Sequence, residues 1–333
     1  MEQSNLTFEE FKDQVKDNIL RYLPEAYGEA DVTVNEVLKN NDTKLSGLLI
    51  KADDKNIAPN IYLEGYFKMY QNGDSLDVVM RKIADTYLEH SNVENFDVSE
   101  ITDWEKVKDR IICRLINAEY NKEYLAEKPH TYFEDLAVVY TVNLGESEEG
   151  RMTAAITNAM MASYGVTVDE LHQVALDNLS RSEMSFKSMR DVMIEMMGED
   201  AAMLIPEEET HSMYVLTNES KIHGASAILD KGMLEHISDT VGGDFVVLPS
   251  SVHEVIIVPV MDRFNTRELQ DMVHEVNATQ VAADEQLSEN VYIYDSAEKE
   301  LILADRMAER LKERELQEQA QSQDDVVRRH RGR

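Results

Sequence analysis

The sequence predicts an α+β fold in which antiparallel hairpins are interleaved with helices and the N-terminal part is mainly helical. Three observations support this fold class. Capping boxes precede amphipathic segments, β-branched runs stand in pairs on either side of turn residues, and strands do not alternate with helices as in a doubly wound sheet. Of the 333 residues, 43% are apolar and 29% are charged, which is typical of a chain that buries a core.

Capping boxes, in which Thr is followed three residues later by Glu, stand at Thr7, Thr102 and Thr167, and each predicts the start of a helix. Pro24 should end the first of these helices. Before residue 206 we expect helices at residues 7–23, 61–70, 75–90, 102–120, 167–179 and 189–196, and hairpins at residues 32–50 and 136–156. The aromatic residues of 61–70 leave a strand as the alternative for that segment.

Beyond residue 206, strands and helices follow one another more regularly. We expect strands at residues 213–217, 222–229, 245–248, 255–260 and 291–294, and helices at residues 231–241, 265–276 and 297–321. The first two strands should form a hairpin, and residues 245–248 should pair with residues 255–260 across a turn at 249–254. The strands at 213–217, 245–248 and 255–260 are therefore expected in one antiparallel sheet.

Composition suggests three parts along the chain: a helix-rich α+β part at residues 1–205, an α+β part with antiparallel sheet at 206–299, and a charged helix with a basic tail at 300–333. The boundary is drawn where Pro206 is followed by three Glu residues. We interpret the basic cluster at residues 328–333 as a frayed terminus. A contact with nucleic acid or with an acidic partner is the alternative.

The chain is strongly acidic, with 65 Asp and Glu residues against 33 Lys and Arg residues and a formal net charge of −32. Such a charge disfavours direct binding to plain nucleic acid or to an anionic membrane. The natural complement is a basic protein partner. One version of this hypothesis is a DNA mimic, which would need a patterned acidic face.

The cellular compartment is predicted from cysteine content and from the absence of long apolar runs. Cys113 is the single cysteine, which excludes an internal disulfide and a multi-cysteine metal site. Its apolar neighbours predict a buried, inert thiol. The acidic first 25 residues do not resemble a signal peptide. The longest apolar run, residues 255–261, is far shorter than the roughly 20 residues that cross a bilayer. We therefore expect a cytoplasmic protein with no membrane segment.

Several phrases of the sequence are distinctive when taken together. They are Leu115-Ile-Asn117, Asp135-Leu-Ala-Val-Val139, Met213-Tyr-Val-Leu-Thr-Asn218, Gly224-Ala-Ser-Ala-Ile-Leu229, Leu248-Pro-Ser-Ser-Val-His-Glu-Val255 and Leu287-Ser-Glu-Asn-Val-Tyr292. With these phrases the chain resembles an uncharacterised bacterial family of unknown function, from the first helix to about residue 295. The resemblance implies a full-length bacterial cytoplasmic protein, with Asn218, Gly224 and residues 249–254 as its most characteristic positions. It implies no activity.

Candidate chemistry is concentrated in the last third of the chain. Five of the nine histidines fall between residues 211 and 274, but none has the spacing of a metal motif, and neither GxGxxG nor a P-loop occurs. We therefore predict no metal site and no cofactor. His223 and His253 both stand beside expected turns and could converge. Ser250, Ser251, His253 and Glu254 have the residue types of a catalytic triad, although such residues also shape turns by bonding backbone amides.

Two function hypotheses follow from these observations. The first is an acidic, cytoplasmic binding or regulatory protein that acts through a macromolecular partner and is not an enzyme. The alternative is a hydrolase or metal-assisted enzyme whose site surrounds the turn at 249–254. The candidate site residues are the same for both, either as binding groups or as catalytic groups: His223, Ser250, Ser251, His253 and Glu254.

Overall fold

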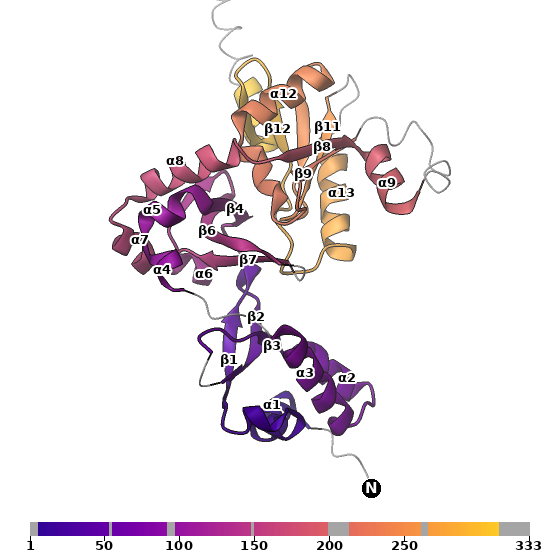
Figure 1. Cartoon of the computed structure of the whole chain (residues 1–333). Coiled ribbons are helices and arrows are strands. Elements are labelled where there is room, and N and C mark those ends of the chain that lie inside the picture. Colours follow the sequence, from indigo (N-terminus) through magenta and orange to yellow (C-terminus); the bar gives the residue numbers. More distant parts are fainter. Residues whose placement is uncertain are drawn as a thin grey trace, which may run out of the picture. The chain divides into compact units, whose positions relative to one another are not determined.

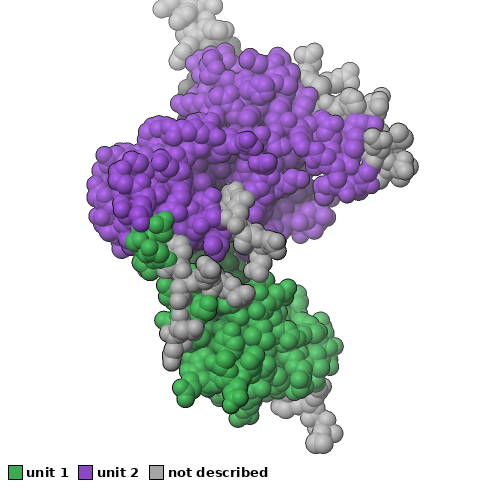
Figure 2. Space-filling view, viewed as in Figure 1, with its two compact units in different colours: residues 1–100 green, residues 101–333 purple. Residues whose placement is uncertain are grey.

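A computed structural model describes residues 6–52, 55–91, 97–147, 150–198, 213–260 and 266–312. The chain divides into two compact units, Met1–Glu100 and Ile101–Arg333 (Figure 2). The described strands form three antiparallel sheets of three, four and six strands, and helices stand among the strands along the chain (Figure 1). The fold is therefore α+β with a helical N-terminus, as the sequence predicts.

The first unit begins with the predicted helix and hairpin. Helix α1 (Phe8–Asn18) is opened by a capping box in which the Thr7 side chain accepts from the Glu10 amide. A 3₁₀ turn, η1 (Ile19–Tyr22), continues it. Strands β1 (Asp31–Leu38) and β2 (Lys44–Lys51) pair antiparallel, and the short helix η3 (Asn40–Asp42) lies between them.

The rest of the first unit corrects one expectation. The segment predicted as a helix at 61–70 starts instead as strand β3 (Asn60–Tyr62), which pairs with β2, and only then becomes helix α2 (Glu64–Gln71). Helix α3 (Leu76–His90) follows, with Ser75 as its N-cap. Helices α1 and α3 bury their apolar faces with β2 in one core, which includes Phe11, Leu48 and Ile83.

The second unit opens with the largest error of the sequence-based prediction. Residues 102–120 were expected to form one helix, but only α4 (Ser99–Thr102) and α5 (Trp104–Val107) are α-helical. Residues 108–110 form the 3₁₀ helix η4 (Lys108–Arg110), and Ile111–Asn117 form strand β4. It pairs along its whole length with β6 (Leu136–Ser147), so long-range pairing overrides the local helix signal.

In the four-stranded sheet around β6, the hairpin predicted at residues 136–156 is confirmed, but the sequence predicts neither the strand at 130–133 nor the helices at 122–126 and 158–164. Strand β5 (His130–Phe133) and strand β7 (Gly150–Ala155) both pair with β6. Helices α6 (Lys122–Ala126) and α7 (Asn158–Tyr164) lie between and after these strands. The capping box at Thr167 is confirmed, since its side chain accepts from the Glu170 amide at the start of α8 (Val168–Leu179).

The six-stranded sheet has the order β13-β12-β10-β11-β9-β8. Its strands are β8 (Met184–Ser188), β9 (Tyr214–Asn218), β10 (Phe245–Leu248), β11 (Val255–Pro259), β12 (Tyr292–Asp295) and β13 (Glu300–Leu303). The three segments predicted to share an antiparallel sheet are β9, β10 and β11, so that prediction is confirmed. Helix α9 (Met189–Met197) follows the edge strand β8 (Figure 1).

Two further expectations in this part are wrong. Residues 222–229 were expected to be a strand, but they contain the 3₁₀ helix η5 (Gly224–Leu229), because β9 pairs with β8 and β11 instead of with this segment. Residues 297–321 were expected to be a long helix. Residues 297–299 form a turn and 300–303 form strand β13, so the helix starts only at residue 304; it is helical through 312, and residues 313–321 lie outside the described residues.

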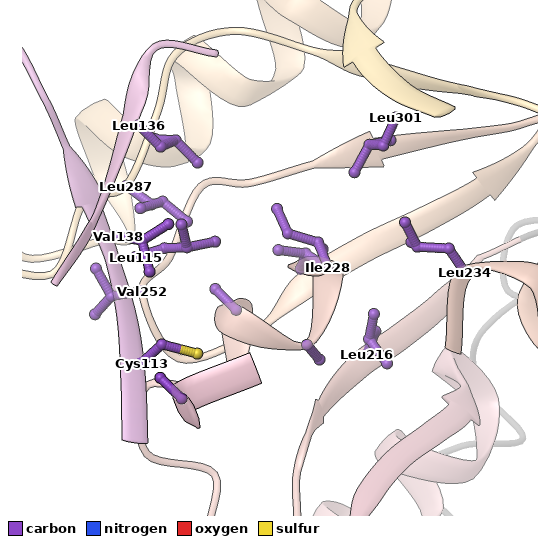
Figure 3. Close-up of a cluster of buried hydrophobic side chains, with 14 of the residues drawn as sticks. Cys113, Leu115, Leu136, Val138, Leu216, Ile228, Leu234, Val252, Leu287 and Leu301 are labelled. Carbon is purple, nitrogen blue, oxygen red and sulfur yellow. The ribbon is translucent and has the colours of Figure 1, made fainter. Parts of the chain in front are cut away.

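The two larger sheets share one hydrophobic core (Figure 3). Side chains from both sheets, from η5 and from helix α12 (Lys231–Val241) converge there; among them are Leu115, Val138, Leu216, Ile228 and Leu234. The other face of β10 packs against α13 (Thr266–Thr279) through Val246, Leu248 and Val273. Strand β10 is therefore buried on both faces.

The predicted boundary at 205/206, the basic cluster at 328–333 and His211 lie outside the described residues. Strands β8 and β9, which stand on either side of that boundary, pair in a single sheet, and the two compact units divide at residues 100/101. In the described part of the chain, no helix is long and apolar enough to cross a bilayer.

Candidate functional site

Residues 218–226 form a closed loop after strand β9, here called the His223 loop. Asn218 organises it with its side-chain amide. Its Nδ2 donates to the Ile222 carbonyl oxygen at 2.8 Å, and its Oδ1 accepts from the Ser220 hydroxyl at 3.0 Å and from the Ile222 amide at 3.2 Å. A side chain that replaces backbone partners in this way fixes a tight turn. The side chain of Asn218 therefore stabilises the conformation of the loop.

Two residues of the His223 loop adopt left-handed backbone conformations without being glycine. Lys221 and His223 both have φ of 54°, which costs on the order of 1 kcal/mol or more for each residue. Gly224 follows, where a Cβ atom would lie 2.5 Å from the His253 carbonyl oxygen and 2.6 Å from the Asn218 nitrogen. Only glycine fits this close approach of three backbone segments.

The His223 loop is bonded to the turn at residues 249–254. The Thr217 hydroxyl donates to the His253 carbonyl oxygen at 2.7 Å, and the Ala225 amide donates to the Val252 carbonyl oxygen at 3.2 Å. The positions that are most characteristic in the sequence, Asn218, Gly224 and the turn at 249–254, thus meet at one place in the fold.

Main-chain groups bond the Ser251 hydroxyl and the Ser250 carbonyl oxygen of this turn. The buried Ser251 hydroxyl accepts from the His253 amide at 3.0 Å. The Ser250 carbonyl oxygen accepts from the Leu287 amide at 3.1 Å, and the Val252 amide donates to the Glu285 carbonyl oxygen at 2.9 Å. This is the pattern of hydroxyls and carbonyls that shape a turn.

His223 and His253 converge, as their positions beside the two turns allow. Their rings stack with centroids 5.4 Å apart and planes inclined by 19°. The His223 amide donates to Nδ1 of His253 at 3.3 Å, which assigns the proton of the neutral His253 ring to Nε2. That nitrogen lies 3.5 Å from Oε1 of Glu285.

The five candidate residues thus have different surroundings. The structure brings His223, Ser251 and His253 together, but the Ser251 hydroxyl contacts the main chain of His253 and not its ring. Ser250 contributes a carbonyl group, and Glu254 is half-buried. Among the described residues, no group of three His, Cys, Asp or Glu side chains could hold a metal ion.

A cavity of about 480 Å³ opens beside the His223 loop. Its polar lining includes Asn178, Ser182, Asn218, Ser220 and His223, and its charged lining consists of Glu183 and Glu219, with no Lys or Arg among the described residues that form it. Of the five candidate residues, only His223 lines this cavity. Sequence reasoning missed Glu183 and Glu219, because only the pairing of β8 with β9 brings them to one place.

The apolar part of the cavity lining includes Ile112, Cys113, Leu179, Met184 and Ile222. Cys113 is only 4% exposed, and its burial raises the pKa of the thiol to about 12. Since the thiolate is the nucleophile, Cys113 is the inert thiol that the sequence predicts and contributes only apolar surface to the cavity.

A second polar cluster explains other distinctive phrases. The Asp135 carboxylate accepts from the Ser288 hydroxyl at 2.7 Å, from Nδ2 of Asn290 at 2.9 Å and from the Tyr292 hydroxyl. Burial, together with the Asp135 charge, raises the pKa of Tyr292 well above its usual range. Nearby, Nδ2 of Asn117 donates to the Leu287 carbonyl oxygen at 3.1 Å. These residues join the four-stranded sheet to the segment that leads into β12.

Comparison with known proteins agrees with the resemblance seen in the sequence. Residues 8–296 match the model of DUF5688, a family of unknown function, and the chain belongs to this family. No curated protein matches the chain, and no solved structure matches it.

Proposed function

We propose that this member of the DUF5688 family is a binding or regulatory protein of the bacterial cytoplasm that holds a basic protein partner and is not an enzyme. One observation carries the proposal. The cavity beside the His223 loop is lined by Glu183 and Glu219 and, among the described residues, by no cationic side chain. The chain that bears it has a net charge of −32.

Electrostatics supports a basic partner over other classes. A strongly acidic protein attracts cationic surfaces from a distance, which raises association rates. The same charge repels the phosphates of nucleic acids and of anionic lipids. The single cysteine supports the cytoplasm as the compartment in which the protein works. A protein is preferred over a small cation because so large a charge is spread over residues 1–299, whereas residues 300–333 carry no net charge.

The contacts at the turn favour this proposal over the hydrolase alternative. A serine nucleophile must give its proton to a neighbouring base, but the contact between Ser251 and His253 runs from the backbone amide of His253 to the Ser251 hydroxyl oxygen and does not involve the ring. The two ring nitrogens of His253 face the His223 amide and Glu285. Both side chains therefore have roles that support the loop.

The proposal is tested by measuring the binding of three synthetic octapeptides that differ only in charge: basic, neutral and acidic. We expect the full chain to bind the basic peptide alone at about 0.15 M salt, with an affinity that falls as the salt concentration rises. Fluorescence anisotropy of labelled peptides measures this directly. Equal binding of all three peptides, or no binding of the basic one, would overturn the proposal.

A further inference from the structure

We propose that Tyr132 is a reactive tyrosine whose hydroxyl group is activated by His130, and that it accepts an acyl group from an uncharged, activated ester. The inference goes beyond the proposed function, because it adds a site of covalent modification to a binding protein and requires no catalytic turnover. Three features of the described residues carry it: an exposed phenol, an imidazole oriented to accept the phenol proton, and a partly apolar groove beside both.

The two side chains stand on one face of strand β5. His130 and Tyr132 are two residues apart in this strand, so their side chains leave it on the same side. Strand β5 is the last strand in the order β4-β6-β5. The two rings meet edge to face, with centroids 5.1 Å apart. Tyr132 is 69% exposed, so a reagent in solution can reach its side chain.

The hydrogen bonds of His130 fix the position of its proton. Nδ1 of His130 lies 2.9 Å from the Lys128 carbonyl oxygen. Because a carbonyl oxygen only accepts, Nδ1 carries the proton, and Nε2 of the neutral ring is an acceptor. The Tyr132 hydroxyl lies 3.2 Å from Nε2 and donates to it. A hydroxyl group that donates to a base, which is itself oriented by a third group, has the arrangement of an activated nucleophile.

The groove beside this pair favours an uncharged donor. It has a volume of about 480 Å³, and Leu125 and Ala126 supply apolar surface to its lining. Its charged lining consists of Glu119, Lys122 and Asp135 among the residues that the structure describes, and Lys122 is paired with Glu119. The carboxylates outnumber the ammonium group, so a phosphate ester or another anionic donor would be repelled. An acyl group with an apolar chain fits the remaining surface.

The reaction transfers one acyl group. The Tyr132 oxygen attacks the carbonyl carbon of the donor while Nε2 of His130 takes the phenol proton. The bond from this carbon to the leaving group then breaks, and the leaving group departs with the electron pair and receives the proton from His130. The products are an O-acyl tyrosine and a free alcohol or thiol. Since phenolate is itself a good leaving group, the donor must be activated, as an aryl ester or a thioester is.

The first test uses the wild-type, full-length chain and p-nitrophenyl acetate, an uncharged activated ester. The reference is N-acetyltyrosinamide, a fully exposed phenol with no base beside it. An unassisted phenol reacts as its phenolate and therefore accelerates only towards pH 10. With an imidazole base, Tyr132 should already be acetylated at pH 7.5, at least about tenfold faster than the reference. Mass spectrometry of the digested protein measures the rate at this residue.

The second test removes the base. His130→Gln should slow the acetylation of Tyr132 at least about tenfold at pH 7.5. The matched control is His236→Gln, which removes an exposed histidine of the same unit that does not line the groove, and it should change the rate less than about twofold. Mono-p-nitrophenyl succinate, an anionic donor of similar reactivity, should acylate wild-type Tyr132 more slowly than the acetate does, relative to the same reference.

Three outcomes would overturn the inference. Equal rates for Tyr132 and N-acetyltyrosinamide would show that the phenol is not activated, and this comparison needs no variant, so it holds even if His130→Gln impairs folding. An unchanged rate in a folded His130→Gln protein would show that the imidazole is not the base. Acetylation of His130 or Lys122 in place of Tyr132 would assign the nucleophile to another group. None of these results bears on the binding of a basic peptide, which tests the proposed function separately.

Discussion

The imidazole rings of His223 and His253 stack at 5.4 Å, and the backbone amide of the first donates to Nδ1 of the second. This pair joins two segments that are 30 residues apart in the sequence. It shows that the second histidine serves as a hydrogen-bond acceptor for the His223 loop. The loop in turn forms one wall of the cavity.

Replacing His253 by Ala should weaken the loop without unfolding the protein. The variant loses one hydrogen bond, one ring contact and the exposed contact with Glu285, so we expect the free energy of unfolding to fall by about 1–2 kcal/mol. Urea denaturation followed by circular dichroism measures the change. A loss above about 4 kcal/mol would show that the ring supports the core and not only the loop.

Gly224→Ala should be much more harmful than its size suggests. The added methyl group would meet the His253 carbonyl oxygen and the Asn218 nitrogen, both backbone atoms, and it would lie closer still to Oγ1 of Thr217. We expect a destabilisation of about 2–3 kcal/mol. Adding Thr217→Ala removes only the third clash and should not restore stability, which the same denaturation experiment can check. Full rescue by the double variant would contradict the backbone argument.

The Cys113 thiol should react very slowly in the folded protein. With a pKa raised to about 12 by burial, its thiolate fraction at pH 8 is about a thousandfold lower than that of an ordinary cysteine. Ellman's reagent should therefore label the native chain only on the timescale of unfolding, and label it rapidly in urea. Fast labelling of the native protein would show that the Cys113 thiol becomes accessible to the reagent without unfolding.

His172 predicts how stability changes with pH. Burial lowers the pKa of this histidine, and the hydroxyl of Tyr140 lies 3.0 Å from its Nδ1. At a pH below the unfolded-state pKa of about 6.5 but above the folded-state pKa, His172 is protonated in the unfolded chain and neutral in the folded chain. Stability should therefore fall as pH drops from about 6.5 towards the lowered folded-state pKa.

Comparison with His172→Gln isolates this contribution. The variant should lose less stability than the wild type over the same acidic interval, whereas the difference between the two should stay constant above about pH 8, where the histidine is neutral in both states. Urea titrations at a series of pH values provide the measurement. Parallel pH profiles for the two proteins would contradict the assignment.

Sequence signals that act over a few neighbouring residues predict helix starts well. The capping boxes at Thr7 and Thr167 predict helix starts that the structure contains, because a cap depends only on neighbouring residues. The box at Thr102 precedes Ile111–Asn117, which forms β4 since it pairs with β6. That pairing depends on residues 136–142, which are distant in the sequence, so the residues around Thr102 alone cannot predict it.

The candidate site was foreseen only in part, for the same reason. Turn signals on either side placed His223 and His253 where they could meet, and the structure brings them together. No motif or spacing in the sequence indicates that the carboxylates of Glu183 and Glu219 lie close together. Their proximity follows from the register of Met184 with Asn218, which hydrophobic patterning cannot supply.

The Asn117–Leu287 hydrogen bond spans 170 residues of sequence, and this distance has a kinetic consequence. Sequence-distant contacts slow folding because a long loop must close first. A ribosome adds about 5–20 residues each second, so the four-stranded sheet would emerge on the order of ten seconds before the segment that covers it. During synthesis its apolar face would then stay open to chaperones, while Met1–Glu100, which forms its own compact unit, could already be folded.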